Sequence, residues 1–237
     1  MGKQQIKIEL IDHMGSDLST VNSARVSFDK ESEYDVERTV DNIGCELSWC
    51  NTTNVLKESD KKLIKYLASH RHTTPFRHNQ VTIRCHAPIF LARQLGKHQA
   101  GLSWNEVSRR YVDSEPEFFV PDEWRGRPDG SIKQGSGGDL WETPKYVKDR
   151  YEGFIATAHT CYTDMLEAGV APEMARMVLP QSMMTSWYWS GNLLAFAHVY
   201  KERINEGAQL EAQWFAEELD KVIRPLFPES WKALVDG

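Results

Sequence analysis

The sequence predicts a globular protein that combines α-helices with short β-strands. Of its 237 residues, 41% are hydrophobic and 26% are charged, which is typical of a soluble globular domain. Some segments alternate apolar and polar residues, as half-buried strands do, whereas others repeat apolar residues at helical spacing. Neither an internal repeat nor a break in composition divides the chain, so we expect one domain over residues 1–237.

Two strands and three helices are expected in the first half of the chain. Residues 6–11 alternate apolar and polar side chains, which is typical of a strand with one buried face. Leu63, Ile64 and Leu67 share one side of a helix and predict an amphipathic helix. In chain order, we expect a strand at 6–11, a helix from Ser16 or Asp17 towards Phe28, a helix from Ser59 that ends before Thr73, a strand at 80–86 and a helix that begins at Pro88.

The second half is predicted to be mainly helical. Residues 122–141 are rich in glycine, proline and charge, which predicts a long mobile loop, either a lid or an insertion. Thr143 and Pro144 then provide a capping residue and a proline for the first helical turn. In chain order, we expect a long helix up to Gly169, a short helix from Pro172, a strand at 185–189 and helices near 191–203 and 208–226.

The charge balance and the cysteines exclude several classes of protein. The net charge of −6 argues against a general nucleic-acid-binding surface, because phosphate binding needs a broad basic face. No apolar run is long enough to span a membrane, and the N-terminus lacks an apolar signal core, so we expect a cytoplasmic protein. The spacing of the four cysteines matches no common zinc or redox motif, and we expect them to be reduced and buried: Cys45, Cys50, Cys85 and Cys161.

Residues 93–111 concentrate positive charge in this acidic chain and are the first candidate functional segment. The run Ser108-Arg109-Arg110 offers a hydroxyl and two guanidinium groups, a combination that binds phosphate or carboxylate oxygens. In a strand, Ser108 and Arg110 would share one face and Arg109 would point away. The alternative interpretation is a solvated strand face without a ligand.

Histidines form a second candidate group. None of their spacings matches the helical His-x-x-x-His pattern of metal sites, so we favour histidines that bind a ligand or simply pack over a zinc site. A metal-dependent hydrolase therefore ranks last among the function hypotheses. The residues of this group are His70, His72, His78, His86 and His98.

Two further arginines stand among apolar neighbours, at Arg176 and Arg203. A buried guanidinium without a partner is unfavourable, so each is expected to face a carboxylate or a ligand anion. Motifs for dinucleotide binding, ATP binding, serine hydrolysis and dithiol chemistry are missing from the sequence. The usual classes of nucleotide-binding and hydrolytic enzymes are thus not indicated.

Taken together, several motifs resemble the flavin-dependent thymidylate synthases (ThyX). They occur in the family's order at residues 69–78, 86–94, 105–111 and 175–180, within a resemblance that extends from Ile8 to Glu211. The Trp187-Tyr-Trp segment and the loop around Gly135 resemble the phage and virus branch of the family, which would place the protein in the cytoplasm of an infected host.

The resemblance implies an α+β fold with a central mixed or antiparallel sheet flanked by helices. It also implies reductive methylation of dUMP to dTMP. In that reaction 5,10-methylenetetrahydrofolate donates the carbon, FAD carries the hydride and NADPH is the reductant. A homotetramer would build each active site from several subunits, and neither a metal nor a cysteine nucleophile would be required.

Carried onto this sequence, the family's dUMP site falls on Gln94, Lys97, Glu106, Ser108, Arg109, Arg110, Arg176 and Arg203. The family's FAD contacts fall on His72, Thr74, Lys97, His98, Gln99, Glu106, Asn192 and His198. The resemblance also implies that Arg203 stabilises uracil ionised at N3, which makes Arg203 the expected catalytic residue.

The sequence differs from the family pattern at several places. The family has Arg-His-Arg and seven residues before the serine, whereas Lys97-His98-Gln99 is followed by eight residues before Ser108. We therefore expect one extra residue to bulge between these segments. Arg77 and Gly207 also replace a common glutamate and a common histidine. An alternative is a catalytically inactive protein that binds dUMP or another nucleotide for regulation.

Overall fold

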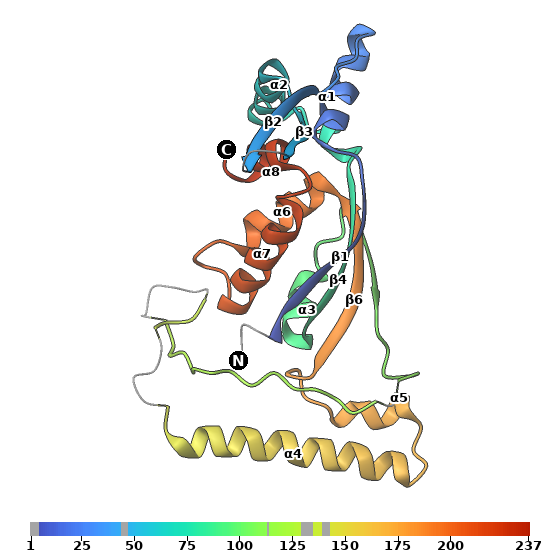
Figure 1. Cartoon of the computed structure of the whole chain (residues 1–237). Coiled ribbons are helices and arrows are strands. Elements are labelled where there is room, and N and C mark those ends of the chain that lie inside the picture. The colour runs from blue at the N-terminus through green and yellow to red at the C-terminus, as the bar shows by residue number, and fades with distance from the viewer. Residues whose placement is uncertain (1–4, 44–46, 113, 129–134, 139–142) are drawn as a thin grey trace.

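The computed structural model describes residues 5–43, 47–112, 114–128, 135–138 and 143–237. A four-stranded sheet in the order β1-β4-β6-β5 forms its centre (Figure 1). Every neighbouring pair of these strands is antiparallel, so the expected α+β class with an antiparallel sheet is confirmed. The strands are β1 (Lys7–Met14), β4 (Gln80–Pro88), β5 (Leu102–Glu106) and β6 (Met184–Asn192).

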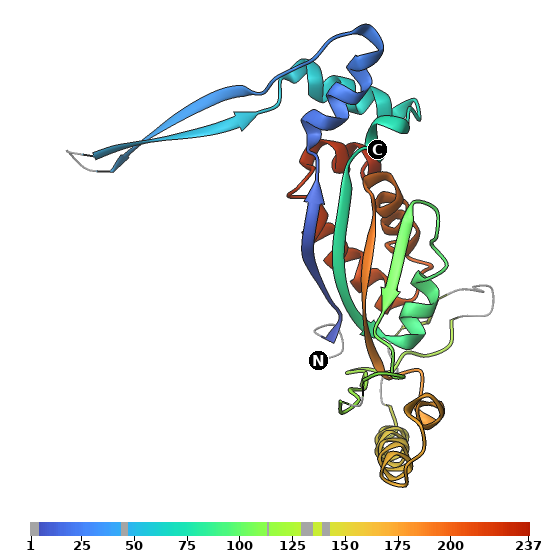
Figure 2. The same cartoon turned by 90° about the vertical axis from the view of Figure 1, so that its right-hand side faces the viewer.

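One face of the sheet carries the main core. Along β4, Val81, Ile83 and Cys85 are buried while Arg84 between them is exposed, which is the alternation that predicted this strand. Helices α6 (Leu193–Arg203) and α7 (Leu210–Ile223) cover the buried face (Figure 2). Apolar burial against these two helices therefore holds the sheet in place.

The remaining helices largely match the sequence predictions. They are α1 (Asp17–Arg25), α2 (Glu58–Ser69), α3 (Ile89–Leu95), α4 (Lys145–Glu167), α5 (Pro172–Ala175) and α8 (Pro228–Val235), with short 3₁₀ segments η2 (Val26–Phe28), η3 (Thr74–Arg77) and η4 (Arg176–Val178). The expected helices from Ser16, Ser59, Pro88, Thr143 and Pro172 are confirmed to within a few residues. The helices expected near 191–203 and 208–226 correspond to α6 and α7.

Four elements were not expected from the sequence. Strands β2 (Asp35–Ile43) and β3 (Leu47–Val55) pair only with each other and project away from the central sheet (Figure 2). The short strand β5 and the C-terminal helix α8 were also missed. Five residues in β5 and eight in α8 are too few to show a clear apolar repeat.

A buried carboxylate joins α1 to α8. Both oxygens of Asp17, which is 5% exposed, accept backbone N–H groups of Glu229 and Ser230 at 2.9 and 2.8 Å. These groups belong to the first turn of α8, where helix N–H groups have no partner within the helix. Asp17 therefore caps a helix more than 200 residues away in sequence.

The described parts of the predicted loop at 122–141 contact the body of the protein. Arg125 donates from one nitrogen to both oxygens of the buried Glu211 on α7, at 2.7 and 2.8 Å. Its Nε also donates to Ser136 at 2.7 Å. Residues 129–134 and 139–142 lie outside the described ranges, so the choice between lid and insertion stays a prediction.

The cysteine prediction was only partly correct. Cys85 is buried in the core, and burial raises the pKa of its thiol. Cys161 on α4 is exposed. Cys45 lies outside the described residues. Among the described helices, none is both long enough and apolar enough to cross a membrane.

Replacement of Asp17 by alanine is expected to destabilise the protein by about 1–2 kcal/mol, because two N–H groups of α8 lose their acceptor. Chemical unfolding in urea measures this change in the free energy of unfolding. The matched control is Asp149→Ala at an exposed position of α4, where the free energy should change by less than about 0.5 kcal/mol. Equal stability of the two variants would contradict the capping role.

Candidate functional site

Arg203 lies at the centre of one group of predicted site residues. From the last turn of α6, its Nε and one Nη reach Nε2 of His98 at 3.0 and 2.9 Å. The ring of His98 also meets the ring of His198 edge-on, with centroids 5.8 Å apart. Arg203, His98 and His198 are called the Arg203 cluster below.

The imidazole of His98 is held in its neutral form. Partial burial, the positive charge of Arg203 and the neighbouring His198 lower its pKa from 6.5 to about 4. Because a guanidinium can only donate, Nε2 of His98 must accept and its proton is assigned to Nδ1. The cluster thus presents a fixed cation beside an uncharged imidazole.

Arg203 was expected to be buried against a carboxylate or a ligand anion. The structure shows it partly buried, with a histidine as its hydrogen-bond partner instead. The two contacts use two of the five N–H donors of the guanidinium, so it retains donors for a ligand.

Gln94 lies one turn before His98 and donates its amide to the side chain of Gln209. Gln209 is the residue immediately before α7, so this contact connects α3 to α7. No chemical role was predicted for Gln209, although the resemblance included the segment around it. A lone glutamine has no distinctive sequence signal. Gln209 is therefore recognised as a candidate site residue only from its position beside Gln94 in the structure.

Most of the predicted flavin residues lie around the same end of β5. Lys97 and Gln99 are exposed on either side of His98. The side chain of Asn192 caps α6 by accepting from Ala195 at 2.9 Å, and the backbone N–H of Asn192 donates to Gly101 at 3.3 Å. Both His72 and Thr74 are exposed at the start of η3, and His72 contacts the ring of Tyr66 at a centroid distance of 5.9 Å.

Gly101 allows the turn before β5 to approach α6 closely. Its φ of +75° is in the left-handed region, and an added Cβ would stand 2.5 Å from Nδ2 of Asn192. From Leu102 to Glu106, β5 then pairs with β6 in continuous register. An extra residue between positions 99 and 108 is therefore not accommodated as a bulge within the strand.

A second group of predicted residues lies beyond the other end of β5. Arg110 is 3.5 Å from the carboxylate of Glu173 on α5, and Nε of Arg176 donates to the backbone carbonyl of Glu173 at 3.3 Å. Two arginines that are far apart in sequence therefore meet at one residue. Arg110, Arg176, Glu173 and the nearby Ser108 are called the Arg110 cluster below.

The structure corrects two expectations about this cluster. Arg176 is exposed rather than buried, because the short helix α5 and η4 lie at the surface. Residues 108–111 form a turn rather than a strand, with the N–H of Tyr111 donating to Ser108 at 3.0 Å. The hydroxyl of Ser108 accepts the backbone N–H of Arg110 at 3.3 Å.

Arg109 and Glu106 have other partners. Arg109 donates to the carbonyls of Ser114 and Glu115, so it shapes the loop that follows. The carboxylate of Glu106 accepts from Thr185 at 2.8 Å and from Nε1 of Trp104 at 3.3 Å. Both contacts orient Glu106 at the end of β5, with accepting capacity left for a ligand.

Within one chain the two clusters are separate. The five residues of β5 span about 17 Å at about 3.3 Å per residue, and the clusters lie beyond its opposite ends. Among the described residues, no hydrogen bond or ion pair joins the Arg203 cluster to the Arg110 cluster. Within one chain, the residues predicted to bind dUMP are therefore not gathered in one place.

The histidines do not gather into a metal site. His70 stacks on Tyr66 with ring centroids 4.0 Å apart, and His86 hydrogen-bonds Ser186 at 2.9 Å. In the part of the chain that the structure describes, no group of three or more histidine, cysteine or acidic residues is arranged to hold a metal ion.

Fold and site together define an α+β protein that carries two separate arginine clusters at the opposite ends of β5. Residues 9–229 match the protein family described as thymidylate synthase complementing protein. Since the match covers most of the chain, this protein belongs to that family, and the expected relationship to flavin-dependent thymidylate synthases is confirmed.

Two relatives illustrate the similarity. A flavin-dependent thymidylate synthase of Thermosipho africanus is 33% identical over 228 residues, which cover 96% of this chain and 90% of that protein. One of Thermus thermophilus is 34% identical over 226 residues, which cover 95% of this chain and 74% of that protein.

Solved structures agree with this assignment. The UMP/dUMP methylase PolB of Streptomyces cacaoi bound with 5-Br UMP superposes with a TM-score of 0.78 at 28% identity, covering 98% of this chain and 94% of that chain. The same protein bound with 5-Br dUMP gives a TM-score of 0.77 at 29% identity, with coverage of 98% and 95%.

The pKa of His98 predicts a dependence of stability on pH. Folded His98 binds its proton with a pKa of about 4, whereas the unfolded value is near 6.5, so the folded state holds fewer protons between these values. The stability that depends on neutral His98 is therefore fully present above pH 6.5 and is lost as the pH falls towards 4.

Replacement of Arg203 by methionine should raise the pKa of His98 towards 6.5, because a neighbouring cation is removed. Titration of the histidine ring signals by NMR measures this pKa directly in both proteins. A pKa of His98 near 6.5 in the wild-type protein would contradict the proposed neutral imidazole.

Proposed function

We propose that this protein is a flavin-dependent thymidylate synthase. It methylates dUMP reductively to dTMP, with 5,10-methylenetetrahydrofolate as the carbon donor, FAD as the hydride carrier and NADPH as the reductant. The observation that carries the proposal is the pair of arginine clusters, within a chain that matches the family over residues 9–229.

The residues proposed to hold FAD fit this cofactor. Neutral His98 offers an N–H donor at Nδ1, and Asn192 offers an amide. When bound, FAD supplies hydride transfer, and the protein binds and orients it. We assign the cofactor-binding role to His72, Thr74, Lys97, His98, Gln99, Glu106, Asn192 and His198.

Arg203 is the proposed catalytic residue. Its guanidinium is held by His98, and a neutral imidazole leaves the positive charge of Arg203 uncompensated. That charge would stabilise uracil ionised at N3, which increases electron density at C5 where the new carbon bond forms. The uracil proton at N3 is released, and the anion is paired with Arg203 instead of with solvent.

Phosphate binding is assigned to the Arg110 cluster. Arg110 and Arg176 are both exposed, and a phosphate dianion would replace the Glu173 carboxylate as the partner of Arg110 while accepting from the remaining donors of Arg176. Ser108 adds a hydroxyl donor beside them. Gln94, Lys97, Glu106 and Arg109 complete the proposed set for dUMP.

The separation of the two clusters supports a homotetramer with shared active sites. A nucleotide bridges both clusters most simply if a second copy brings its Arg110 cluster to the first copy's Arg203 cluster. Apolar side chains near the Arg110 cluster support this arrangement, because Tyr111, Phe154 and Met177 are 78%, 58% and 69% exposed in the single chain.

The remaining assignments follow from the family relationship. We propose a single synthase domain over residues 1–237 and a cytoplasmic location. The phage and virus branch stays a prediction.

Purified protein provides the decisive experiment for the function. A yellow preparation with flavin absorbance near 450 nm, which converts dUMP to dTMP in the presence of the folate and NADPH, would support the proposal. Parallel assays with UMP in place of dUMP determine which nucleotide is the substrate, since the name of the similar methylase PolB includes both UMP and dUMP. A colourless protein that takes up no FAD and forms no dTMP would instead support the nucleotide-binding regulatory alternative.

The Arg176→Ala substitution is expected to weaken dUMP binding by about 1.5–3 kcal/mol through loss of a charge-assisted contact. Isothermal titration with dUMP measures the affinity. Lys148→Ala on α4 serves as the control, because Lys148 is exposed and outside the proposed site. Unchanged affinity in the Arg176 variant would remove this residue from the site.

Mixing two defective variants tests the shared site. Arg176→Ala and Arg203→Ala should each lose most activity at low dUMP concentration, since each removes one half-site. If the half-sites come from different subunits, mixed oligomers of the two variants contain some intact sites and recover part of the activity. If the mixture after subunit exchange shows only the sum of the activities of the two variants, the shared site is contradicted.

A further inference from the structure

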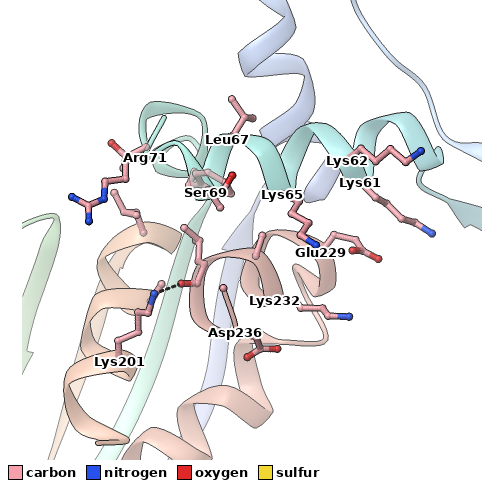
Figure 3. Close-up of a pocket in the computed structure, with 18 of the residues that line it drawn as sticks. Lys61, Lys62, Lys65, Leu67, Ser69, Arg71, Lys201, Glu229, Lys232 and Asp236 are labelled. Atoms are coloured by element: carbon pink, nitrogen blue, oxygen red, sulfur yellow. Dashed lines mark hydrogen bonds between the residues drawn. The ribbon is translucent and has the colours of Figure 1, made fainter.

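A groove between α2, α6 and α8 lies outside both arginine clusters. Its volume is about 1020 Å³ (Figure 3). Apolar residues form part of its lining, among them Phe76, Leu194 and Ala197. The lining also includes His198, the only residue of the proposed flavin set in it.

The rim of the groove is strongly basic. Six cationic side chains line it against the side chains of three acidic residues, in a chain whose net charge is −6. The cations are Lys61, Lys62, Lys65, Arg71, Lys201 and Lys232, and the acidic residues are Glu58, Glu229 and Asp236.

Two of these carboxylates are already paired. Glu58 is bound to Lys61 at 2.6 Å, and Asp236 is bound to Arg224 at 3.0 Å. The third, Glu229, lies beside the ammonium end of Lys65 (Figure 3). The basic rim therefore keeps an excess of positive charge that would attract an anionic ligand.

Arg71 provides an independent sign of a ligand. It follows the C-terminus of α2 with a φ of +57°, a conformation that glycine adopts without strain and that arginine rarely does. The backbone N–H groups of Arg71 and His72 return to Ala68 and Leu67 at 3.1 and 2.8 Å. An arginine at a position that favours glycine points to a role for its side chain at the groove.

We propose that this groove binds the phosphorylated adenosine end of the NADPH reductant. The apolar part of the lining suits a planar base, and the cations suit a pyrophosphate together with a 2′-phosphate. This inference rests on the proposed function and specifies where the second dinucleotide binds. It also assigns the preference for NADPH over NADH to the basic rim, because NADH lacks the 2′-phosphate.

The charge of the ligand distinguishes NADPH from FAD as the occupant. A 2′-phosphate adds a charge of about −1.5 to −2 at pH 7 to the two negative charges of a pyrophosphate. FAD carries only the pyrophosphate, and its proposed residues share only His198 with the groove. The excess of cations therefore matches the more highly charged nucleotide.

Adenosine 2′,5′-bisphosphate is the probe for this site, titrated calorimetrically into protein saturated with FAD. The proposal expects it to bind at least tenfold more tightly than adenosine 5′-monophosphate, because of the extra phosphate contacts. Failure of the probe to bind once the protein is saturated with FAD, or equal affinity for the two nucleotides, would overturn the proposal. Binding is measured without turnover, so failure at this site and failure of synthase activity are separate results.

Substitutions that change the charge of the groove in opposite directions make the test more specific. The double variant Lys65→Gln and Lys232→Gln should weaken the probe about tenfold and raise the KM for NADPH but not for NADH. Glu229→Gln should strengthen binding, because it removes a carboxylate that competes with the ligand. Lys148→Gln on α4 is the control with the same charge change outside the groove.

Arg71→Gly separates ligand binding from folding. Relief of the left-handed strain should leave the melting temperature unchanged or higher, while the affinity for the probe falls about tenfold. Unchanged affinity in this well-folded variant, or an equal rise of KM for NADPH and NADH, would overturn the assignment of the groove.

Discussion

The antiparallel pairing of β5 with β6 determines where the candidate functional residues lie. Trp104 of β5 stacks on Trp187 of β6 with ring centroids 4.3 Å apart, and Trp187 in turn stacks over Phe215 of α7. A shift of one residue would turn Trp104 to the outer face, so this aromatic contact favours a single register. That register holds the Arg203 cluster and the Arg110 cluster at opposite ends of a strand too short to bend.

Positively charged side chains gather locally, although the net charge of the molecule is negative. The chain is acidic as a whole, yet the Arg110 cluster and the basic groove concentrate cations at the surface. Beside Arg203, a carboxylate would have neutralised the guanidinium, whereas neutral His98 orients it and leaves its charge available. Burial and the positive charge of Arg203 keep the imidazole of His98 uncharged. Arg203 thus favours the neutral state of the histidine that orients it.

The success of sequence prediction varied with the kind of signal. Long helices such as α4 were predicted correctly, because an apolar repeat over several turns is a strong local pattern. In the single chain only Ala158 and Tyr162 of α4 are buried, so the same pattern did not identify what its other apolar residues pack against. Strands β2, β3 and β5 were missed because pairing with another strand, and not their own sequence, decides their conformation.

By itself, the sequence determined the class of fold, the family and the residue types available for anion binding, since all of these are carried by order and spacing. Only the tertiary structure decided that Arg203 meets His98, which is 105 residues away, and that Arg110 and Arg176 meet at Glu173. It also moved Arg176 from an expected buried position to the surface. The physical reason is that burial and pairing depend on neighbours brought together by folding, and spacing along the chain does not encode them.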